Sequence, residues 1–593
     1  TMDTLRETDR PRVLKVATPF PFPEKLALEF LDGLEEVYVI EELDPFLERM
    51  LFLTCGKYGK QIKIHGKLDG TVKSAGENTT TEIKRLFEKV FYEGEEKEGR
   101  VLPPLPVRPP VLCAGCPHRA SFYAVKQATK GEKTIYCGDI GCYTLGNAKP
   151  LDMCDTCLCM GAGLGIAQGV WHIEPDTKAF AFVGDSTFFA SGIPGVINGF
   201  YNQADMTLCI LDNSTTAMTG HQPHPGTGKT MMGEVVEKAD IEKVLRGAGI
   251  ETVETVNPLE LEKTVETVKR VSEKKGVKAI IFRYPCIVKW KPKGQKARVE
   301  EAKCISCKKC IRELGCPAVI LKDGKAFIDE TLCTGCTLCE QVCPTGAISG
   351  GEAKNPEKAL ASYEEKKKIS GAIDSDTVKE RSAEKKESLH IKETEIKTGE
   401  SGQIQKNIVL SGVGGQGTIL ASKLIAETAM RAGIPIQTAE TIGMAQRGGS
   451  VFSHLRLGKG VYSPLMAEGK ADLIIGFEPA EAVRMLPYLK KGGTVVTSMR
   501  PVYPVSAMIG DSVYEVEEIL SYLKKQVENL VLVDAEKALR ELGNDKVLNI
   551  LLLGAAADTG ELGFEKAALK ETIRIKLPEK LHELNFKALE YER

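Results

Sequence analysis

Apolar and polar positions alternate along this chain in blocks that predict strands followed by helices. Residues 178–184, 206–212 and 278–284 are short apolar runs (KAFAFVG, MTLCILD and KAIIFRY), which is typical of strands buried in a parallel sheet. Residues 12–55 predict strand, helix, strand and helix, as VLKVATPF, EKLALEFLDGL, EVYVIEEL and DPFLERMLF. Such alternation predicts domains of the α/β class.

The same pattern divides the chain into segments of different character. A proline-rich break, LPPLPVRPP, ends the first α/β stretch, and cysteine-dense loops run from Lys303 to Gly350. Next comes a charged stretch with few large apolar residues, which predicts a flexible linker. A separate α/β stretch closes the chain, with NIVLSGV, ADLIIGF, GGTVVTS and NLVLVDA as its strands. The predicted domains are 1–100, 101–295, 296–350, 351–406 (the linker) and 407–593.

Length and charge narrow the class of protein. The chain has 593 residues, which is longer than a single hydrophobic core usually stabilises, so a multidomain α/β protein is expected. The balance of 79 basic and 81 acidic residues indicates neither nucleic acid nor anionic membrane as a partner. No stretch has the roughly 18 apolar residues of a membrane span, and a cytoplasmic location is expected. The start at Thr1 predicts an incomplete reading frame or a processed end.

The 18 cysteines fall in clusters with short spacings, which indicates metal binding in a reducing compartment. Two C-x2-C-x2-C triplets, each followed by Cys-Pro, predict two [4Fe–4S] clusters in which each triplet takes its fourth ligand from beyond the other triplet. A pair of zinc sites is the alternative, but zinc has no use for a triplet. The predicted ligand sets are Cys304, Cys307, Cys310 and Cys343, and Cys333, Cys336, Cys339 and Cys316.

Two polar groups follow neighbouring apolar strands. Gly184, Asp185 and Ser186 follow one strand, and Asn213 follows the next. Mg2+ prefers oxygen ligands, so we expect it to bind the Asp185 carboxylate, the Asn213 side chain and the Thr215 carbonyl. The spacing resembles the magnesium-diphosphate motif of thiamine enzymes, although a Gly-Asp after a strand is more often only a turn.

Longer motifs carry a resemblance to a family. CAGCPHR, DIGCYTLG, CMGAGLGIAQG, FVGDSTFFASGI, LDNSTTAMTGHQ and FRYPC resemble the thiamine domain of the indolepyruvate type of 2-oxoacid:ferredoxin oxidoreductases. The resemblance implies thiamine diphosphate, Mg2+, a third [4Fe–4S] cluster beside the thiamine, and coenzyme A as co-substrate. The implied ligands of that cluster are Cys113, Cys116, Cys142 and Cys286. The remaining cysteines of this domain are expected to be buried thiols, with Cys157 the first substitute ligand; they are Cys137, Cys154, Cys157 and Cys159.

Three histidines are candidates for acid-base work or for binding a substrate carboxylate. His221 lies in TMTGHQ beside the expected magnesium loop, and we take it as the candidate catalytic residue. His118 and His224 are expected to be ordinary loop histidines.

The flanking domains also resemble parts of this family. Residues 1–100, with VYVIEELDPFLE, resemble its transketolase carboxyl-terminal-like domain, where Glu41 and Glu42 are expected to be structural or interfacial. The pyrimidine-binding domain that precedes it in the family has no counterpart in the sequence, which predicts a truncated amino terminus or a separately encoded partner. Residues 407–593, with GVGGQG and TAETIGMAQRGGSVFSHLRLG, resemble the gamma-type subunit.

The last domain contains a glycine loop after its first strand. Gly412, Gly414 and Gly417 satisfy G-x-G-x-x-G, with Glu440 where a ribose-binding acid would be sought. We expect the loop to bind an anion such as a phosphate of coenzyme A, with Arg447 as the counter-charge or simply a surface arginine.

These features lead to three hypotheses. The first is oxidative decarboxylation of an aryl 2-oxoacid to its acyl-coenzyme A with reduction of ferredoxin, in an enzyme that forms oligomers; pyruvate and other 2-oxoacids stay open as substrates. The second is a noncatalytic electron-transfer and scaffold chain that needs a separate pyrimidine-domain partner. The third is an NAD-linked dehydrogenase that uses the terminal glycine loop, which the sequence disfavours because it offers clusters and no hydride-accepting site.

Overall fold

The computed structural model describes residues 11–79, 82–83, 85–87, 102–290, 295–351, 404–441, 448–461 and 463–592. The chain divides into two compact units. The first comprises residues 1–101 with 465–472 and 487–491, and the second comprises 102–464, 473–486 and 492–593. Most of the predicted linker (352–403) lies outside the described residues.

The amino-terminal part of the first unit is a small α/β fold with a parallel pair of strands. Its elements are α1 (Glu24–Leu31), β1 (Glu36–Tyr38), α2 (Phe46–Tyr58) and β2 (Lys63–His65). The strand expected at VLKVATPF does not form: residues 11–20 have no strand, and Pro19 within the stretch removes a ladder donor. Glu41 accepts the backbone N–H groups of Leu47 and Glu48 at the start of α2, which is a structural role.

A five-stranded parallel sheet forms the centre of residues 102–290, in the order β3-β4-β5-β7-β6. Strands β4 and β5 coincide with the apolar runs 178–184 and 206–212, because continuous apolar runs suit strands covered on both faces. The elements are α4 (Pro117–Ala128), β3 (Thr134–Cys137), η3 (Cys142–Asn147), α5 (Ala162–Ile173), β4 (Lys178–Gly184), α6 (Asp185–Thr187), η4 (Phe188–Gly192), α7 (Ile193–Tyr201), β5 (Met206–Asp212), η5 (Pro225–Thr227), α8 (Ile241–Gly247), β6 (Val253–Val256), α9 (Leu261–Ser272), β7 (Val277–Arg283) and α10 (Ile287–Trp290).

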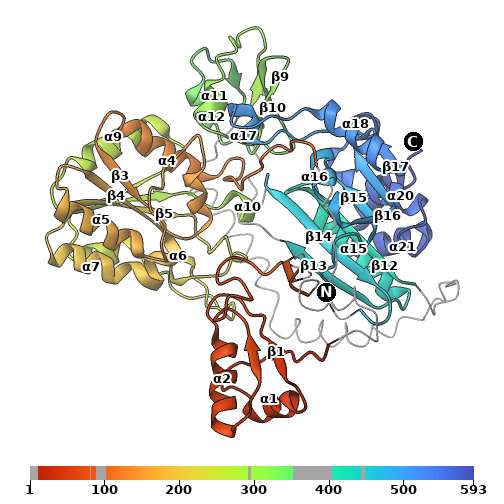
Figure 1. Ribbon diagram of the computed structural model, residues 1–593. Coiled ribbons are helices and arrows are strands. Elements are labelled where there is room, and N and C mark those ends of the chain that lie inside the picture. Colours follow the sequence, from red (N-terminus) through yellow and green to blue (C-terminus); the bar gives the residue numbers. More distant parts are fainter. Residues whose placement is uncertain are drawn as a thin grey trace. The chain divides into compact units, whose positions relative to one another are not determined.

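Helices cover both faces of this sheet, α4 and α9 on one face and α5 and α7 on the other (Figure 1). Alternate residues of β4 face opposite layers, since Phe180 and Phe182 join the core under α4 and α9 while Ala181 and Val183 join the core under α5 and α7. The sheet is therefore the rigid middle layer of this domain, and its loops at the strand ends are free to carry function.

The cysteine-dense segment that follows contains little regular structure. Two antiparallel strand pairs, β9 with β10 and β8 with β11, frame two short helices that begin between the cysteines. The elements are β8 (Arg298–Val299), α11 (Lys309–Arg312), β9 (Val319–Lys322), β10 (Lys325–Ile328), α12 (Leu338–Val342) and β11 (Ile348–Ser349).

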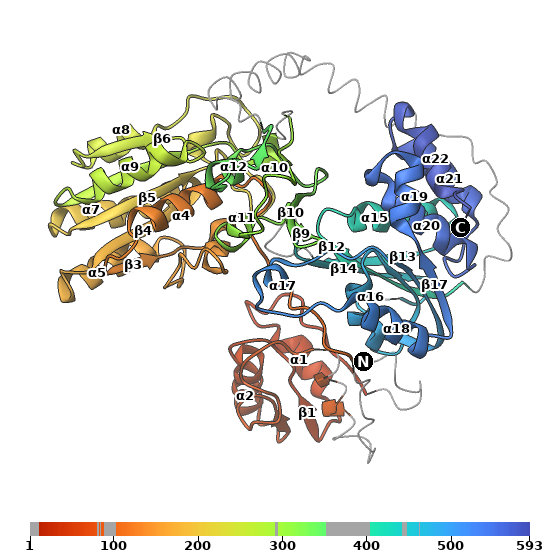
Figure 2. The same ribbon diagram turned by 90° about the horizontal axis from the view of Figure 1, so that it is seen from above.

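The carboxyl-terminal domain is built on a six-stranded sheet in the order β13-β14-β12-β15-β16-β17. Its elements are β12 (Lys406–Val413), α15 (Thr418–Arg431), β13 (Ile436–Thr441), β14 (Ser450–Leu457), β15 (Ala471–Gly476), α16 (Pro479–Arg484), η6 (Leu486–Tyr488), β16 (Leu489–Ser498), α17 (Val505–Ile509), α18 (Val516–Gln526), β17 (Asn529–Val533), α19 (Ala535–Leu542), η7 (Asp545–Val547), α20 (Leu548–Asp558), α21 (Lys566–Lys576), η8 (Glu579–Leu581) and α22 (His582–Leu589). Figure 2 shows α15 and α19 to α22 on one face of the sheet and α16 and α18 on the other.

The four predicted apolar strands of this domain are all present, as β12, β15, β16 and β17. Strand β14 pairs antiparallel with both β12 and β13, which separates β13 from β12. A dinucleotide fold places parallel strands beside the one before the glycine loop. In this domain the antiparallel strand β14 lies beside β12 instead. On this side of β12 the sheet therefore differs from that of a dinucleotide fold.

None of the helices that the structure describes is long and apolar enough to cross a membrane.

Candidate active site and iron–sulfur sites

The loops after β4 and β5 bring the expected magnesium ligands to one edge of the sheet. The two strands are parallel neighbours in which Gly184 pairs with Leu211, so Asp185 and Asn213 leave the sheet at the same end. Asp185, Asn213 and Thr215 are all buried. The geometry of the edge is therefore that of a ligand site in an open α/β sheet.

Asp185 holds a carboxylate oxygen that lacks a hydrogen-bond donor. Its Oδ1 accepts the Ser186 N–H at 2.8 Å. Its buried Oδ2 lies 3.1 Å from His224 Nε2, but neither atom makes a hydrogen bond of acceptable geometry. Burial raises the pKa of Asp185, and the His224 contact partly offsets this. A buried carboxylate oxygen of this kind fits a bound cation, and the oxygen donors around it suit Mg2+.

A histidine fixes the orientation of Asn213. Asn213 Nδ2 donates to His118 Nε2 at 3.0 Å, and its Oδ1 accepts the Thr215 N–H at 3.1 Å. Burial lowers the pKa of His118 to about 4, so its ring is neutral at pH 7 and its Nε2 is free to accept. His118 is therefore held against the magnesium loop.

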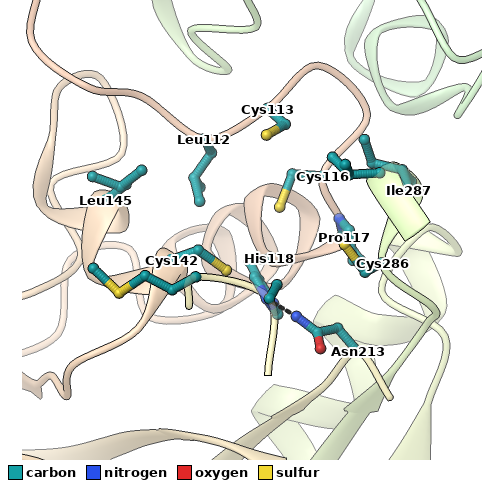
Figure 3. Close-up of a pocket in the computed structure, with 13 residues that line it drawn as sticks. Leu112, Cys113, Cys116, Pro117, His118, Cys142, Leu145, Asn213, Cys286 and Ile287 are labelled. Carbon is teal, nitrogen blue, oxygen red and sulfur yellow. Dashed lines mark hydrogen bonds between the residues drawn. The ribbon is translucent and has the colours of Figure 1, made fainter. Parts of the chain in front are cut away.

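Four cysteines meet in the pocket that adjoins this loop. Cys113, Cys116, Cys142 and Cys286 line it together with His118 and Asn213, and Figure 3 shows the four thiol side chains around a common space. They come from the start of α4, the start of η3 and the end of the segment after β7. The backbone also links the two sites, because the Cys286 N–H donates to the Asn213 carbonyl at 3.0 Å.

The electrostatics of this pocket disfavour free thiolates. Burial, and to a smaller extent the neighbouring cysteines, raises the pKa of Cys116 well above its ordinary value and that of Cys142 to about 12. Irons bound between these sulfurs would reverse that penalty, because a coordinated thiol is deprotonated. The donor set fits a [4Fe–4S] cluster.

The structure also gathers the ferredoxin-like cysteines into two sets. Cys304, Cys307, Cys310 and Cys343 line one cavity. Cys316, Cys333 and Cys336 all contribute to raising the pKa of Cys339, after burial. These are the crossed sets that the spacing predicts. Among the described residues no three His, Cys, Asp or Glu side chains surround a single ion position, whereas a cube spreads its four thiolates over four irons.

The structure corrects two predictions about single residues. His118 and His224 are not ordinary loop histidines, since both are buried at the site, one on α4 and the other beside Asp185. Cys137 is a buried thiol as expected and Cys154 is partly buried, but Cys157 and Cys159 are exposed. Neither of these two lines the pocket of Cys113, so the structure offers no case for Cys157 as a substitute ligand.

His221 and Lys289 both belong to the surroundings of the magnesium loop. His221 is half-buried in a turn after β5, with a left-handed φ of 66° and its N–H donating to the Thr216 carbonyl at 2.9 Å. Lys289 Nζ donates to Thr215 Oγ1 at 2.9 Å. Sequence reasoning missed Lys289, and its only signal was its place three residues after Cys286.

In the glycine loop of the carboxyl-terminal domain, two backbone N–H groups donate hydrogen bonds within the protein. Val413 N–H donates to Gln416 Oε1 at 2.7 Å, and Gly414 N–H donates to the Gly449 carbonyl at 2.8 Å. A Cβ at Gly412 would lie 2.7 Å from Phe477 Cβ, so that glycine serves close packing. Two amides at the start of the loop, those of Val413 and Gly414, are thus already used within the domain, while Arg447 lies outside the described residues.

Three family models match separate parts of the chain. Residues 139–282 match the C-terminal TPP binding domain of thiamine pyrophosphate enzymes, residues 326–349 a 4Fe-4S binding domain, and residues 407–591 pyruvate ferredoxin/flavodoxin oxidoreductase. Together with the site, these matches place the chain among multidomain α/β proteins similar to 2-oxoacid:ferredoxin oxidoreductases.

Individual relatives are more specific. The chain is 43% identical over 342 residues to indolepyruvate oxidoreductase subunit IorA of Methanothermobacter marburgensis, covering 57% of this chain and 55% of the relative. It is 42% identical over 189 residues to subunit IorB of Thermococcus kodakarensis, covering 31% of this chain and 92% of the relative. The chain belongs to the indolepyruvate oxidoreductase family, as an IorA-like part joined to an IorB-like part. It spans about half the length of the IorA relatives.

A solved structure is also similar to part of the chain. The gamma subunit of a keto/oxoacid ferredoxin oxidoreductase from Geobacter sulfurreducens PCA is 24% identical, with a TM-score of 0.23, over 31% of this chain and 94% of that one.

Proposed function

We propose that this chain carries the thiamine diphosphate site and three [4Fe–4S] clusters of an enzyme that oxidises an aryl 2-oxoacid to its acyl-coenzyme A and reduces ferredoxin. The observation that carries the proposal is the shared pocket, in which four cysteines adjoin Asn213 and, through its backbone, the magnesium loop. An electron donor at that loop and an acceptor held by those thiols would be neighbours.

The residues of the chain have separate tasks in this proposal. Asp185, Asn213 and the Thr215 carbonyl would hold Mg2+ against the diphosphate, and His118 keeps the Asn213 amide in one orientation. When bound, thiamine diphosphate supplies the carbon nucleophile that allows a 2-oxoacid to lose carbon dioxide. His221 is the candidate for binding the substrate carboxylate, and the Lys289 ammonium group lies beside Thr215 of the magnesium loop.

The contacts between the cysteine sets give a direction to the electron route. Thr334 packs directly on Gly115, where a Cβ would lie 1.8 Å from its Oγ1, so the loop of Cys333 touches the loop of Cys113 and Cys116. Burial raises the pKa of Cys116 in one set and of Cys336 in the other, and the Arg119 charge opposes both shifts weakly, so one guanidinium acts on both sets. The set of Cys316, Cys333, Cys336 and Cys339 would therefore receive electrons first.

The other set provides the exit. Cys307 is exposed, whereas Cys333 and Cys339 are buried. Electrons would leave through the set of Cys304, Cys307, Cys310 and Cys343 to an external ferredoxin.

The proposed reaction balances without a further reagent. The bond between the carbonyl carbon and the carboxylate breaks, and carbon dioxide leaves. The acyl carbon is oxidised as it forms a bond to the sulfur of coenzyme A, whose thiol proton is released. The two electrons reduce two ferredoxins, one each, which suits one-electron carriers such as iron–sulfur clusters.

A further protein domain is part of the proposal, and the loop after β5 supports it. Met231, Met232 and Val235 are 70%, 91% and 82% exposed in the same loop that begins with Asn213. Apolar side chains grouped in this way mark a surface that another protein covers. We infer that a pyrimidine-binding domain, supplied by a separate chain or by an upstream segment, covers this loop.

The test is anaerobic reduction of a viologen dye by the reconstituted chain, mixed with thiamine diphosphate, Mg2+, coenzyme A and indolepyruvate. The reaction is run with and without the amino-terminal half of an IorA relative as a separate chain. Colour that requires both coenzyme A and indolepyruvate supports the enzyme. Absence of colour in both reactions, with all clusters reducible by dithionite, favours the electron-transfer and scaffold chain. Replacement of indolepyruvate by pyruvate or 2-oxoglutarate identifies the substrate class.

A further inference from the structure

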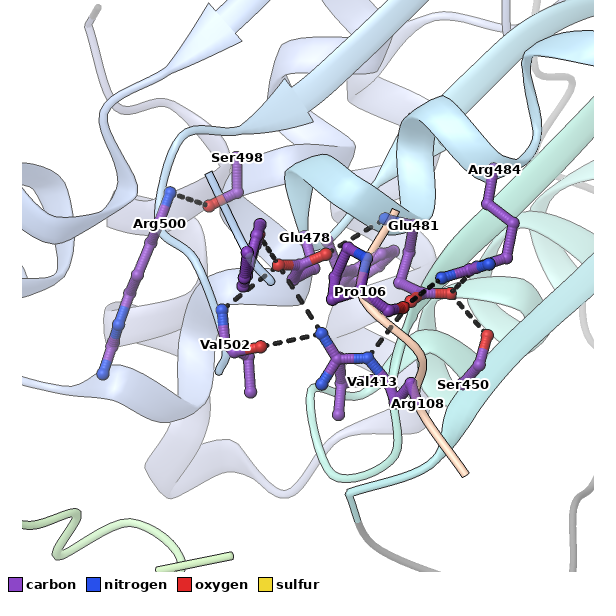
Figure 4. Close-up of polar contacts among 12 residues, drawn as sticks. Pro106, Arg108, Val413, Ser450, Glu478, Glu481, Arg484, Ser498, Arg500 and Val502 are labelled. Atoms are coloured by element: carbon purple, nitrogen blue, oxygen red, sulfur yellow. Dashed lines mark hydrogen bonds and ion pairs between the residues drawn. The ribbon is translucent and has the colours of Figure 1, made fainter. Parts of the chain in front are cut away.

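The segment 106–112 runs from the carboxyl-terminal domain to the pocket of Cys113, and a buried ion cluster holds it. Arg108 Nε donates to Glu481 Oε1 at 3.1 Å, and its Nη2 donates to the Val502 carbonyl at 2.7 Å (Figure 4). Arg108 Nη2 also lies 3.7 Å from Glu478 Oε1. The Arg108 side chain is 2% exposed and both glutamates are 0% exposed.

Charges in this cluster are balanced. Arg484 lies 3.4 Å from Glu481, so two arginines face two carboxylates. Glu478 also accepts hydrogen bonds from Tyr514 and from the Val502 N–H, and Glu481 accepts one from Ser450. Removal of one partner from such a cluster leaves a buried charge without compensation, which is strongly unfavourable.

Backbone contacts and an apolar face extend the same attachment. Arg484 Nη2 donates to the Pro106 carbonyl at 2.9 Å, and Ser506 donates to the Val107 carbonyl. Val505 and Met508 of α17 join the hydrophobic core of the preceding domains. At the other end of the segment, Arg119 donates to the Leu112 carbonyl, directly before Cys113.

We propose that segment 106–112 is a docking site that holds residues 404–592 on residues 102–351 without the covalent connection between them. An apolar helix face and a buried, charge-matched arginine are what a specific protein interface uses. The two parts of the chain also match two separate curated chains. The partner that this site recognises is therefore a domain presenting a buried carboxylate pair and an apolar helix like α17.

The experiment places a specific protease site between residues 380 and 381 of the full chain. The purified chain is cut, and the two fragments are passed over a size-exclusion column at micromolar and then nanomolar concentration. We expect the native fragments to elute together. We expect Arg108→Met to weaken their association at least a hundredfold, so that the fragments separate, and Arg108→Lys to have an intermediate effect because lysine lacks the planar fork.

Two controls make the result decisive. Lys149→Ala removes an exposed ion pair with Asp511, 3.5 Å long, across the same interface, and it should leave the fragments together. Val505→Glu places a charge in the apolar face of α17 and should separate the fragments even though Arg108 is intact. Thermal unfolding of each variant before cleavage shows whether that variant is folded. Separation of the native fragments on cleavage, or co-elution of the Arg108→Met fragments at every dilution that retains the native pair, overturns the proposal.

Discussion

At the scale of single residues, burial decides which side chains take part in the site. The sequence predicts His118 and His224 to be ordinary loop histidines. In the structure both are buried, His118 beside Asn213 and His224 beside Asp185. His118 holds an amide and has a neutral ring, while Asp185 keeps one oxygen without a hydrogen-bond donor. Two substitutions test these assignments.

Asp185→Asn removes the charge that we assign to Mg2+. We expect the affinity for thiamine diphosphate with Mg2+ to fall roughly a hundredfold, since loss of one partner in a buried charged contact costs about 2–5 kcal/mol. Titration calorimetry measures the change, and iron content should stay constant. Asp176→Asn, at an exposed position, is the matched control. Unchanged affinity in Asp185→Asn would remove the magnesium assignment.

His118→Ala leaves the Asn213 amide without its acceptor. A buried donor that loses its partner costs about 1–3 kcal/mol, so we expect roughly tenfold weaker binding of thiamine diphosphate. His118→Gln keeps an acceptor in the side chain and should recover most of the affinity. If alanine and glutamine behave alike, His118 does not act by orienting Asn213.

At the scale of elements, the short helices between the cysteines bring distant thiols together. Helix α11 begins within the first triplet and α12 within the second, and Cys343, which follows the second triplet, lines one cavity with the cysteines of the first.

The crossed ligation predicts which cysteine substitutions resemble each other. Cys316→Ser should alter the same cluster signal as Cys333→Ser, and Cys343→Ser the same signal as Cys304→Ser. Electron paramagnetic resonance of the dithionite-reduced protein separates the two signals. Cys209→Ser, at a buried position outside these sets, should change neither. Pairing of Cys316 with the Cys304 signal would instead mean that each triplet keeps its own following cysteine.

His454 on β14 predicts a pH dependence of stability. Burial lowers its pKa from the ordinary histidine value of 6.5 to about 4, with a further contribution from Arg456. The unfolded chain therefore binds the proton first, so stability present above pH 6.5 is lost as the pH falls towards 4, by up to about 3 kcal/mol. Melting temperatures at pH 7.5 and 5 should differ less in His454→Gln than in the native protein. An equal difference in both would show that other groups set the acid sensitivity.

At the scale of the whole molecule, the proposal requires three clusters in one chain. Among the described residues of the second unit, one proposed ligand of each cluster lies in the same hydrophobic core: Cys116, Cys310 and Cys333. The order of the clusters follows from the Gly115 and Thr334 contact and from the exposure of Cys307.

Iron analysis tests the number of clusters. The anaerobically prepared chain should contain about twelve irons, from three cubes. Cys116→Ser should lower this to about eight and should leave both ferredoxin-like clusters reducible by dithionite. About eight irons in the native chain would mean that the pocket of Cys113 holds no cluster.

Features that depend on local pattern could be predicted from the amino-acid sequence. Strands β4 and β5 follow from continuous apolar runs. Cysteine spacing likewise predicts that Cys304, Cys307, Cys310 and Cys343 come together, and they line one cavity. The predicted strand at residues 13–20 was wrong because a strand also needs a partner and ladder donors, and Pro19 removes one of the donors.

Which distant residues share a site became evident only from the packing of the folded chain. Cys142 and Cys286 are separated by most of a domain, and they meet Cys116 because parallel strands end at one edge of a sheet. The burial of His118 and the exposure of Cys157 could not be predicted for the same reason, since a side chain's access to water depends on what packs over it. Spacing along the chain determines which residues are neighbours within one helix, strand or loop. Contacts between separate elements arise only when the core has formed.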